Sequence, residues 1–110
     1  MMPSLSDWNW YEVMLVQALL GVISNNFRMV TLRFAGDRWF VEAWLLEENQ
    51  MDSDEFFDAI DEFSIFIEDV KQQLSSCSYQ RIVGEIRTGA EPFARNVPDD
   101  ARVVFKRRET

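Results

Sequence analysis

One segment of the chain, residues 52–74, has the apolar spacing of a single long amphipathic helix. Asp52 can cap its first turn, and Glu55 stands three residues on, as in a capping box. Its large apolar residues advance in steps of 4, 3, 4, 3 and 4, which places them on one helix face: Phe56, Ile60, Phe63, Ile67, Val70 and Leu74. A helix with one apolar face must bury it, so the chain needs a second layer.

Residues 27–46 predict that layer as a β-hairpin. Apolar and polar residues alternate on both sides of Gly36-Asp37, a two-residue turn with glycine first, as in a type II′ turn. In that register Ala35 pairs with Arg38, and alternate residues share a sheet face. The expected core face carries Val30, Leu32, Phe34, Trp39, Val41 and Ala43, and the other face carries Arg33, Phe40, Glu42 and Trp44. The second face mixes aromatic and charged side chains, so we expect it to be partly exposed.

Another helix is predicted before the hairpin, and two strands after the long helix. The first helix should begin near Ser6 or Asp7 and run to about Ile23, with apolar residues on every side. Residues 79–87 and 102–107 read as strands, joined by a long loop at 88–101. The prediction is one α+β domain over residues 1–110, in the order α-β-β-α-β-β, with two helices packed on an antiparallel sheet of about four strands.

Charge is distributed unevenly along this chain. Residues 1–70 hold 3 Lys+Arg and 14 Asp+Glu, a net of −11, whereas residues 71–110 hold 8 and 5, a net of +3. Between Glu42 and Asp69 there are eleven acids and no cation. A pI near 4.4 disfavours direct binding of nucleic acid, which calls for a basic surface. A partner of this protein should be cationic.

The acids of the long helix gather opposite its apolar stripe. At about 100° per residue they fall within roughly 140° of the helix circumference. Ile65 lands in the middle of this acidic face and Phe57 near its edge, so both should be exposed. An apolar residue with a charged rim is typical of an interface anchor. An acidic face alone also serves as a solubility device, and the basic tail could neutralise part of it.

The residue types and motifs that the sequence lacks exclude most enzymatic chemistry and favour a binding role. The chain has no His, so imidazole bases and histidine metal ligands are excluded, and its glycines form no phosphate-binding loop. We expect no catalytic residue, no cofactor and no metal site. Cys77 is the single cysteine, and residues 1–12 contain no Lys or Arg, which favours a cytoplasmic protein without a signal peptide. No apolar stretch is long enough for a membrane span.

The segment from Trp10 to Gly21 leading into Phe27-Arg28-Met29-Val30, in a small acidic α+β chain without His, resembles bacterial immunity proteins. These belong to contact-dependent growth inhibition and related polymorphic toxin systems. The resemblance covers most of the chain but carries no diagnostic motif, so no family residues are transferred. It implies a cytoplasmic protein that binds the C-terminal catalytic domain of its cognate toxin and blocks it. Many such toxins are nucleases with basic active-site surfaces.

On this interpretation the acidic face and its approach bind the toxin. The candidate toxin-binding residues are Trp44, Glu47, Glu48, Asp54, Glu55, Phe57, Asp58, Asp61, Glu62, Ile65, Glu68 and Asp69. Two other functions stay open: a dimeric type III secretion chaperone that carries an unfolded effector segment, and a nucleic-acid mimic that inhibits a DNA-acting enzyme. A homodimer contact has two candidate surfaces, the first helix and the Phe40/Trp44 sheet face. The role of Glu12, amid apolar neighbours, stays open.

Overall fold

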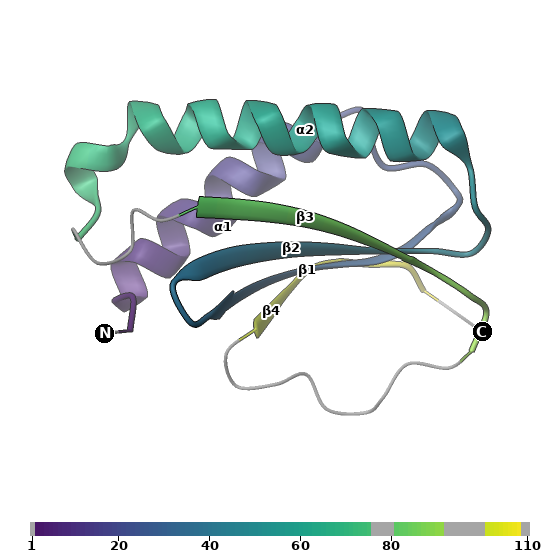
Figure 1. The fold of residues 1–110 in the computed structure, drawn as a ribbon, viewed down its shortest axis with the longest axis horizontal. Coiled ribbons are helices and arrows are strands. Elements are labelled where there is room, and N and C mark those ends of the chain that lie inside the picture. Colours follow the sequence, from purple (N-terminus) through teal and green to yellow (C-terminus); the bar gives the residue numbers. More distant parts are fainter. Residues whose placement is uncertain (1, 76–80, 92–100, 109–110) are drawn as a thin grey trace.

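Both helices cover one face of a four-stranded sheet (Figure 1). The computed structural model describes residues 2–75, 81–91 and 101–108. Cys77, Tyr79 and most of the predicted loop at 88–101 lie outside the described residues. The predicted α+β class and element order are confirmed. The elements are α1 (Leu5–Leu19), β1 (Phe27–Ala35), β2 (Arg38–Leu45), α2 (Gln50–Asp69), a 3-10 helix η1 (Lys71–Gln73), β3 (Arg81–Thr88) and β4 (Ala101–Lys106).

The β1–β2 hairpin has the predicted register. Ala35 pairs with Arg38, and the turn between them has a left-handed backbone at Gly36 (φ 65°), which glycine adopts without a Cβ clash. All six residues assigned to the core face are buried. Of the other face, Arg33, Phe40 and Trp44 are half-buried, and Glu42 is buried.

The sheet is mixed, which corrects the prediction of an antiparallel sheet. Its strand order is β3-β2-β1-β4. β1 pairs antiparallel with β2 and with β4, but β3 runs parallel to β2. A parallel neighbour needs a long crossover, and α2 supplies it between β2 and β3. The alternation of apolar and polar residues in a strand predicts which side chains share a face, but not which strand lies beside it. The sequence alone therefore could not predict the strand order.

Aromatic rings join the two helices to the sheet. Tyr11 of α1 stacks on Trp39 of β2 with ring centroids 3.9 Å apart, and Phe63 of α2 meets Tyr11 edge-on at 5.8 Å. The predicted α2 stripe is buried from Phe56 to Ile67, and its last two members are half-buried. The sheet face towards the helices is therefore the core.

The helix ends differ from the prediction by a few residues. α1 begins two or three residues earlier, because Ser4 is its N-cap and Asp7 is the third helical residue (N3) of a capping box. It ends at Leu19 rather than Ile23, just before Gly21 takes a left-handed φ of 81°. α2 is capped by Asn49 rather than Asp52, and the α-helix ends at Asp69, where η1 follows.

Candidate functional site

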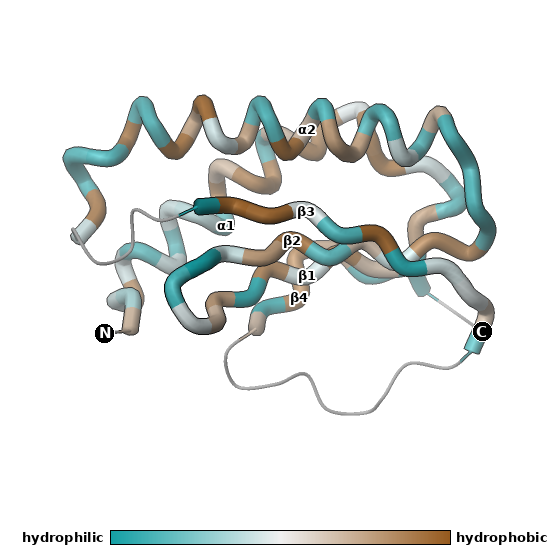
Figure 2. The backbone as a smooth tube through the Cα atoms, viewed as in Figure 1, coloured by the Kyte–Doolittle hydropathy of each residue, from teal (hydrophilic) through white to brown (hydrophobic). Residues whose placement is uncertain are grey.

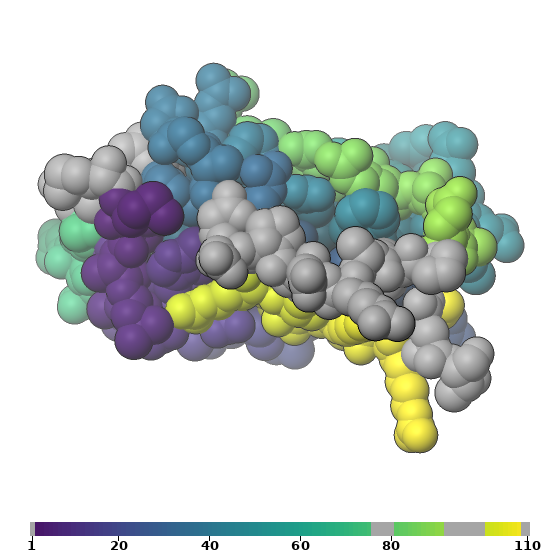
Figure 3. Space-filling model, turned by 90° about the horizontal axis from the view of Figure 1, so that it is seen from below, coloured from purple at the N-terminus to yellow at the C-terminus, as the bar shows by residue number. Residues whose placement is uncertain are grey.

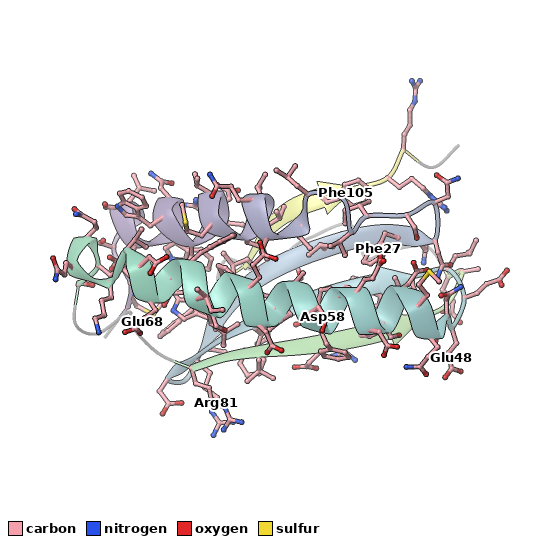
Figure 4. The ribbon with its side chains drawn as sticks, turned by 90° about the horizontal axis from the view of Figure 1, so that it is seen from above. Phe27, Glu48, Asp58, Glu68, Arg81 and Phe105 are labelled. Atoms are coloured by element: carbon pink, nitrogen blue, oxygen red, sulfur yellow. The ribbon has the colours of Figure 1, made fainter. Side chains whose placement is uncertain are left out.

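The outer face of α2 carries the predicted acidic surface. The helix is fixed at its start by the Asn49 side chain, which accepts a hydrogen bond of 3.0 Å from the Asp52 amide. Its inner face is buried against the sheet and α1, so its other face must point to solvent. Seven acids are exposed there, and we call them the acidic face: Asp54, Glu55, Asp58, Asp61, Glu62, Glu68 and Asp69. In Figure 4 the labels Glu48, Asp58 and Glu68 follow the length of this helix.

Among the described residues, most of the acidic face has no cationic partner. In the described part of the chain its single ion pair is Glu68 with Lys71, whose Oε1 and Nζ lie 2.6 Å apart. Asp54 accepts a hydrogen bond from Gln50. Like charges one helical turn apart repel by a few tenths of a kcal/mol per pair. A cationic partner would therefore relieve repulsion that the isolated chain retains.

Two apolar side chains interrupt the acidic face as predicted. Ile65 is 61% exposed and Phe57 is 45% exposed. In Figure 2 the outer side of α2 is mostly coloured as hydrophilic, and one of its turns is coloured as hydrophobic. Phe57 lies at the border with β3, because a Cβ built on Gly84 would stand 3.3 Å from its Cε1 atom. Ile65 therefore has carboxylates around it, and Phe57 adjoins the sheet edge.

Glu47 and Glu48 lie on the β2–α2 connection and are both exposed. Asn26, at the end of the α1–β1 connection, holds this segment in place. Its side-chain oxygen accepts from the Glu47 amide at 2.9 Å, and its amide nitrogen donates to the Glu47 carbonyl at 2.8 Å and to Asp52 Oδ2 at 3.0 Å. The sequence predicted only that the first helix ends before Asn26, because the partners of this side chain are far away along the chain.

Trp44 does not join the acidic face. It alternates with the buried core residues of β2 and so lies on the sheet face opposite the helices. There the Arg87 guanidinium carbon stands 5.5 Å from the Trp44 ring centroid. The remaining candidates, from Glu47 to Asp69, lie on α2 or its approach. The structure therefore separates one predicted binding residue from the others.

Glu42 and Asp52, two members of the acidic run, are buried and belong to internal networks. The Glu42 carboxylate receives Arg33 Nε at 3.0 Å and Arg87 Nε at 3.3 Å. The Arg33 guanidinium also covers Phe40, at 4.6 Å from the ring centroid. This sheet face is a compensated charge cluster.

α1 presents exposed apolar residues that the structure leaves uncovered. Val13, Val16 and Leu20 follow each other at spacings of 3 and 4 and are exposed. Glu12 lies beside this stripe and pairs with Arg102 of β4 at 3.2 Å, which answers the open question about its role. Neither candidate homodimer surface, this helix or the Phe40/Trp44 face, is tested by the structure of one chain.

In the described ranges, no three metal-binding side chains come together as a possible metal site. Neither helix of the same ranges is both long and apolar enough to cross a bilayer.

Comparison with protein families identifies the family of the chain. A family model described as MafI2 immunity protein matches residues 9–109. Comparison with curated protein sequences gives no significant match.

Proposed function

Since the chain belongs to the MafI2 immunity protein family, which implies binding of a cognate toxin, we propose that it neutralises a toxin nuclease through the acidic face of α2. The observation that carries this proposal is the acidic face, seven exposed carboxylates along α2 with Ile65 among them, of which only Glu68 has a cationic partner among the described residues. The inhibitor acts in the cytoplasm of the cell that makes it and performs no reaction itself.

The target class follows from charge. An enzyme that cleaves RNA or DNA needs a basic surface to hold the phosphate backbone. Carboxylates on a rigid helix can occupy that surface in place of phosphates, and their field accelerates encounter with a cationic partner. Ile65 would then supply the desolvated centre of the contact and the carboxylates its charged rim.

Charge reversal on α2 tests the proposal. We expect Asp58→Lys/Asp61→Lys/Glu62→Lys to weaken binding of the toxin domain encoded beside this chain by about a hundredfold, mostly through slower association. All three side chains are exposed, so the fold should persist. The measurements are surface plasmon resonance at several salt concentrations, circular dichroism of the variant, and survival of cells that co-express the toxin.

A matched control separates the site from overall charge. Asp37→Lys changes net charge as much as Asp58→Lys does, but Asp37 lies in the β1–β2 turn with its side chain 82% exposed. Asp37→Lys should leave protection intact, whereas Asp58→Lys should reduce affinity. Unchanged binding by the triple variant would refute the acidic face as the site. Binding of an unfolded effector segment instead of a folded toxin would favour the chaperone alternative.

A further inference from the structure

β3 forms one border of the sheet and has a free side. It pairs along Arg81–Thr88 with β2, and none of the strands in the described ranges lies beyond it. In Figure 1 β3 lies in front of the sheet, below α2, and Figure 3 shows green β3 and yellow β4 on opposite sides of the blue hairpin. A sheet edge of this kind carries unpaired N–H and C=O groups.

One hydrogen bond identifies which groups point outward. The Gly89 amide donates to the Leu45 carbonyl of β2 at 3.0 Å. Since the N–H and C=O of successive strand residues point to alternate sides, those of Val83, Glu85 and Arg87 face β2. The N–H and C=O groups of Ile82, Gly84 and Ile86 therefore point to the free side. No described residue hydrogen bonds to them there.

β3 lacks most devices that block edge pairing. Natural edges are protected by proline, by bulges or by short length. β3 is eight residues long without proline, and its pairing with β2 has no register shift. β4, at the other edge, has six residues, and its pairing with β1 contains a shift. The charges of β3 are partly engaged within the sheet, because Arg87 pairs with Glu42.

The helix above this edge supplies the recognition chemistry. A Cβ at Gly84 would lie 2.9 Å from Ile60 Cγ1 and 3.3 Å from Phe57 Cε1, so α2 packs directly on β3 there. Asp54 and Asp61 lie three residues before and four after Phe57, and are its neighbours on the helix surface. Phe57 and two carboxylates thus stand beside the free side of β3.

We propose that an extended cationic segment of the toxin pairs with β3 as a fifth strand. The side chains of that segment that point towards α2 would then contact Phe57 and the acidic face. This inference rests on the proposed function. Main-chain hydrogen bonds supply affinity in such strand addition, and the flanking side chains supply specificity. A second copy pairing through β3 would bring two acidic faces together, and like-charge repulsion opposes that arrangement.

Amide hydrogen exchange, measured residue by residue by NMR, tests the pairing. In the free chain the amides of Val83, Glu85 and Arg87 are protected by β2, and those of Ile82, Gly84 and Ile86 exchange faster. In the complex with the co-encoded toxin domain, we expect the outward amides to slow by about a hundredfold. A complex that forms without this change would overturn the strand pairing and leave the proposed function standing. Absence of any complex would overturn both.

A matched pair of variants gives a second test. Ile86→Ala and Ile86→Pro both replace the isoleucine side chain with a smaller one, but only proline also removes the outward N–H. We expect the proline variant to bind at least about tenfold more weakly than the alanine variant, provided that circular dichroism shows both folded. Equal affinities would contradict the proposal. Slow exchange of the outward amides in a concentrated toxin-free sample would instead identify a second copy as the occupant.

Discussion

Asp7 accepts hydrogen bonds from both the amide and the hydroxyl of Ser75, 68 residues later. The same carboxylate completes the capping box with Ser4, so the start of α1 is joined to the residue that follows η1 and Leu74. Burial alone would raise the pKa of Asp7. The hydrogen bonds from Ser75 and Ser4 outweigh burial and lower the pKa from 3.8 to about 2.

The Asp7 carboxylate should make the free energy of unfolding depend on pH in the acid range. Because the folded-state pKa lies below the unfolded one, the stabilisation is present above pH 3.8 and is lost as the pH falls through about 2. Its size is on the order of 2 kcal/mol. We expect Asp7→Asn to lower the free energy of unfolding at pH 7 and to differ little from the native chain at pH 2. Urea denaturation across that range measures both, and a constant difference would contradict the prediction.

Gly84→Ala should destabilise the protein, because the added methyl group would clash with the Ile60 side chain of α2. The added Cβ would stand 2.9 Å from Ile60 Cγ1, closer than packed carbons tolerate. We expect a cost of about 1–3 kcal/mol from this overpacking. Urea denaturation of Gly84→Ala, Ile60→Ala and the double variant measures it. The double variant should be more stable than the sum of the two single losses predicts. If the losses simply add, the contact between residue 84 and Ile60 is not the source of the strain.

Glu42→Gln should cost stability because it leaves two guanidinium groups, those of Arg33 and Arg87, without their carboxylate. The Glu42 side chain is 11% exposed, so we expect a loss of about 2 kcal/mol from its charge-assisted hydrogen bonds. The control is Glu85→Gln, whose contact with Arg87 is longer, 3.6 Å, and more exposed. Thermal denaturation should show a large fall in the melting temperature for Glu42→Gln and a small fall for Glu85→Gln.

Ile65→Ala should weaken toxin binding without weakening the fold. Ile65 is 61% exposed, so truncation removes little buried area from the free chain, but a desolvated anchor typically contributes about 1–2 kcal/mol or more to binding. Leu20→Ala is the matched control, because Leu20 is 74% exposed and is the C-cap residue of α1, away from α2 in the sequence. Isothermal titration calorimetry with the toxin domain compares the affinities of the two variants. An equal loss of affinity in both would contradict an interface centred on α2.

The sequence predicted the features that depend on neighbouring residues. Gly36-Asp37 determined the hairpin register, and the apolar steps from Phe56 onward predicted which side of α2 is exposed. The features it missed depend on contacts between distant segments. Neither the hydrogen bonds from Ser75 to Asp7 nor those between Asn26 and Glu47 leave a local pattern in the sequence. Trp44 was grouped with the acidic face because it is close in sequence, although strand alternation turns it to the other side of the sheet.

The parallel pairing of β3 with β2 also orders the events of folding. The β1–β2 hairpin closes through a two-residue turn, so it can form within microseconds once collapse begins. β3 can join only after α2 has carried the chain back along the sheet, and β4 pairs with β1 across most of the sequence. We therefore expect both border strands to dock late. A chain halted during synthesis before Arg81 would lack both β3 and β4, so the edges of β2 and β1 would both be open, and we expect this form to be prone to aggregate.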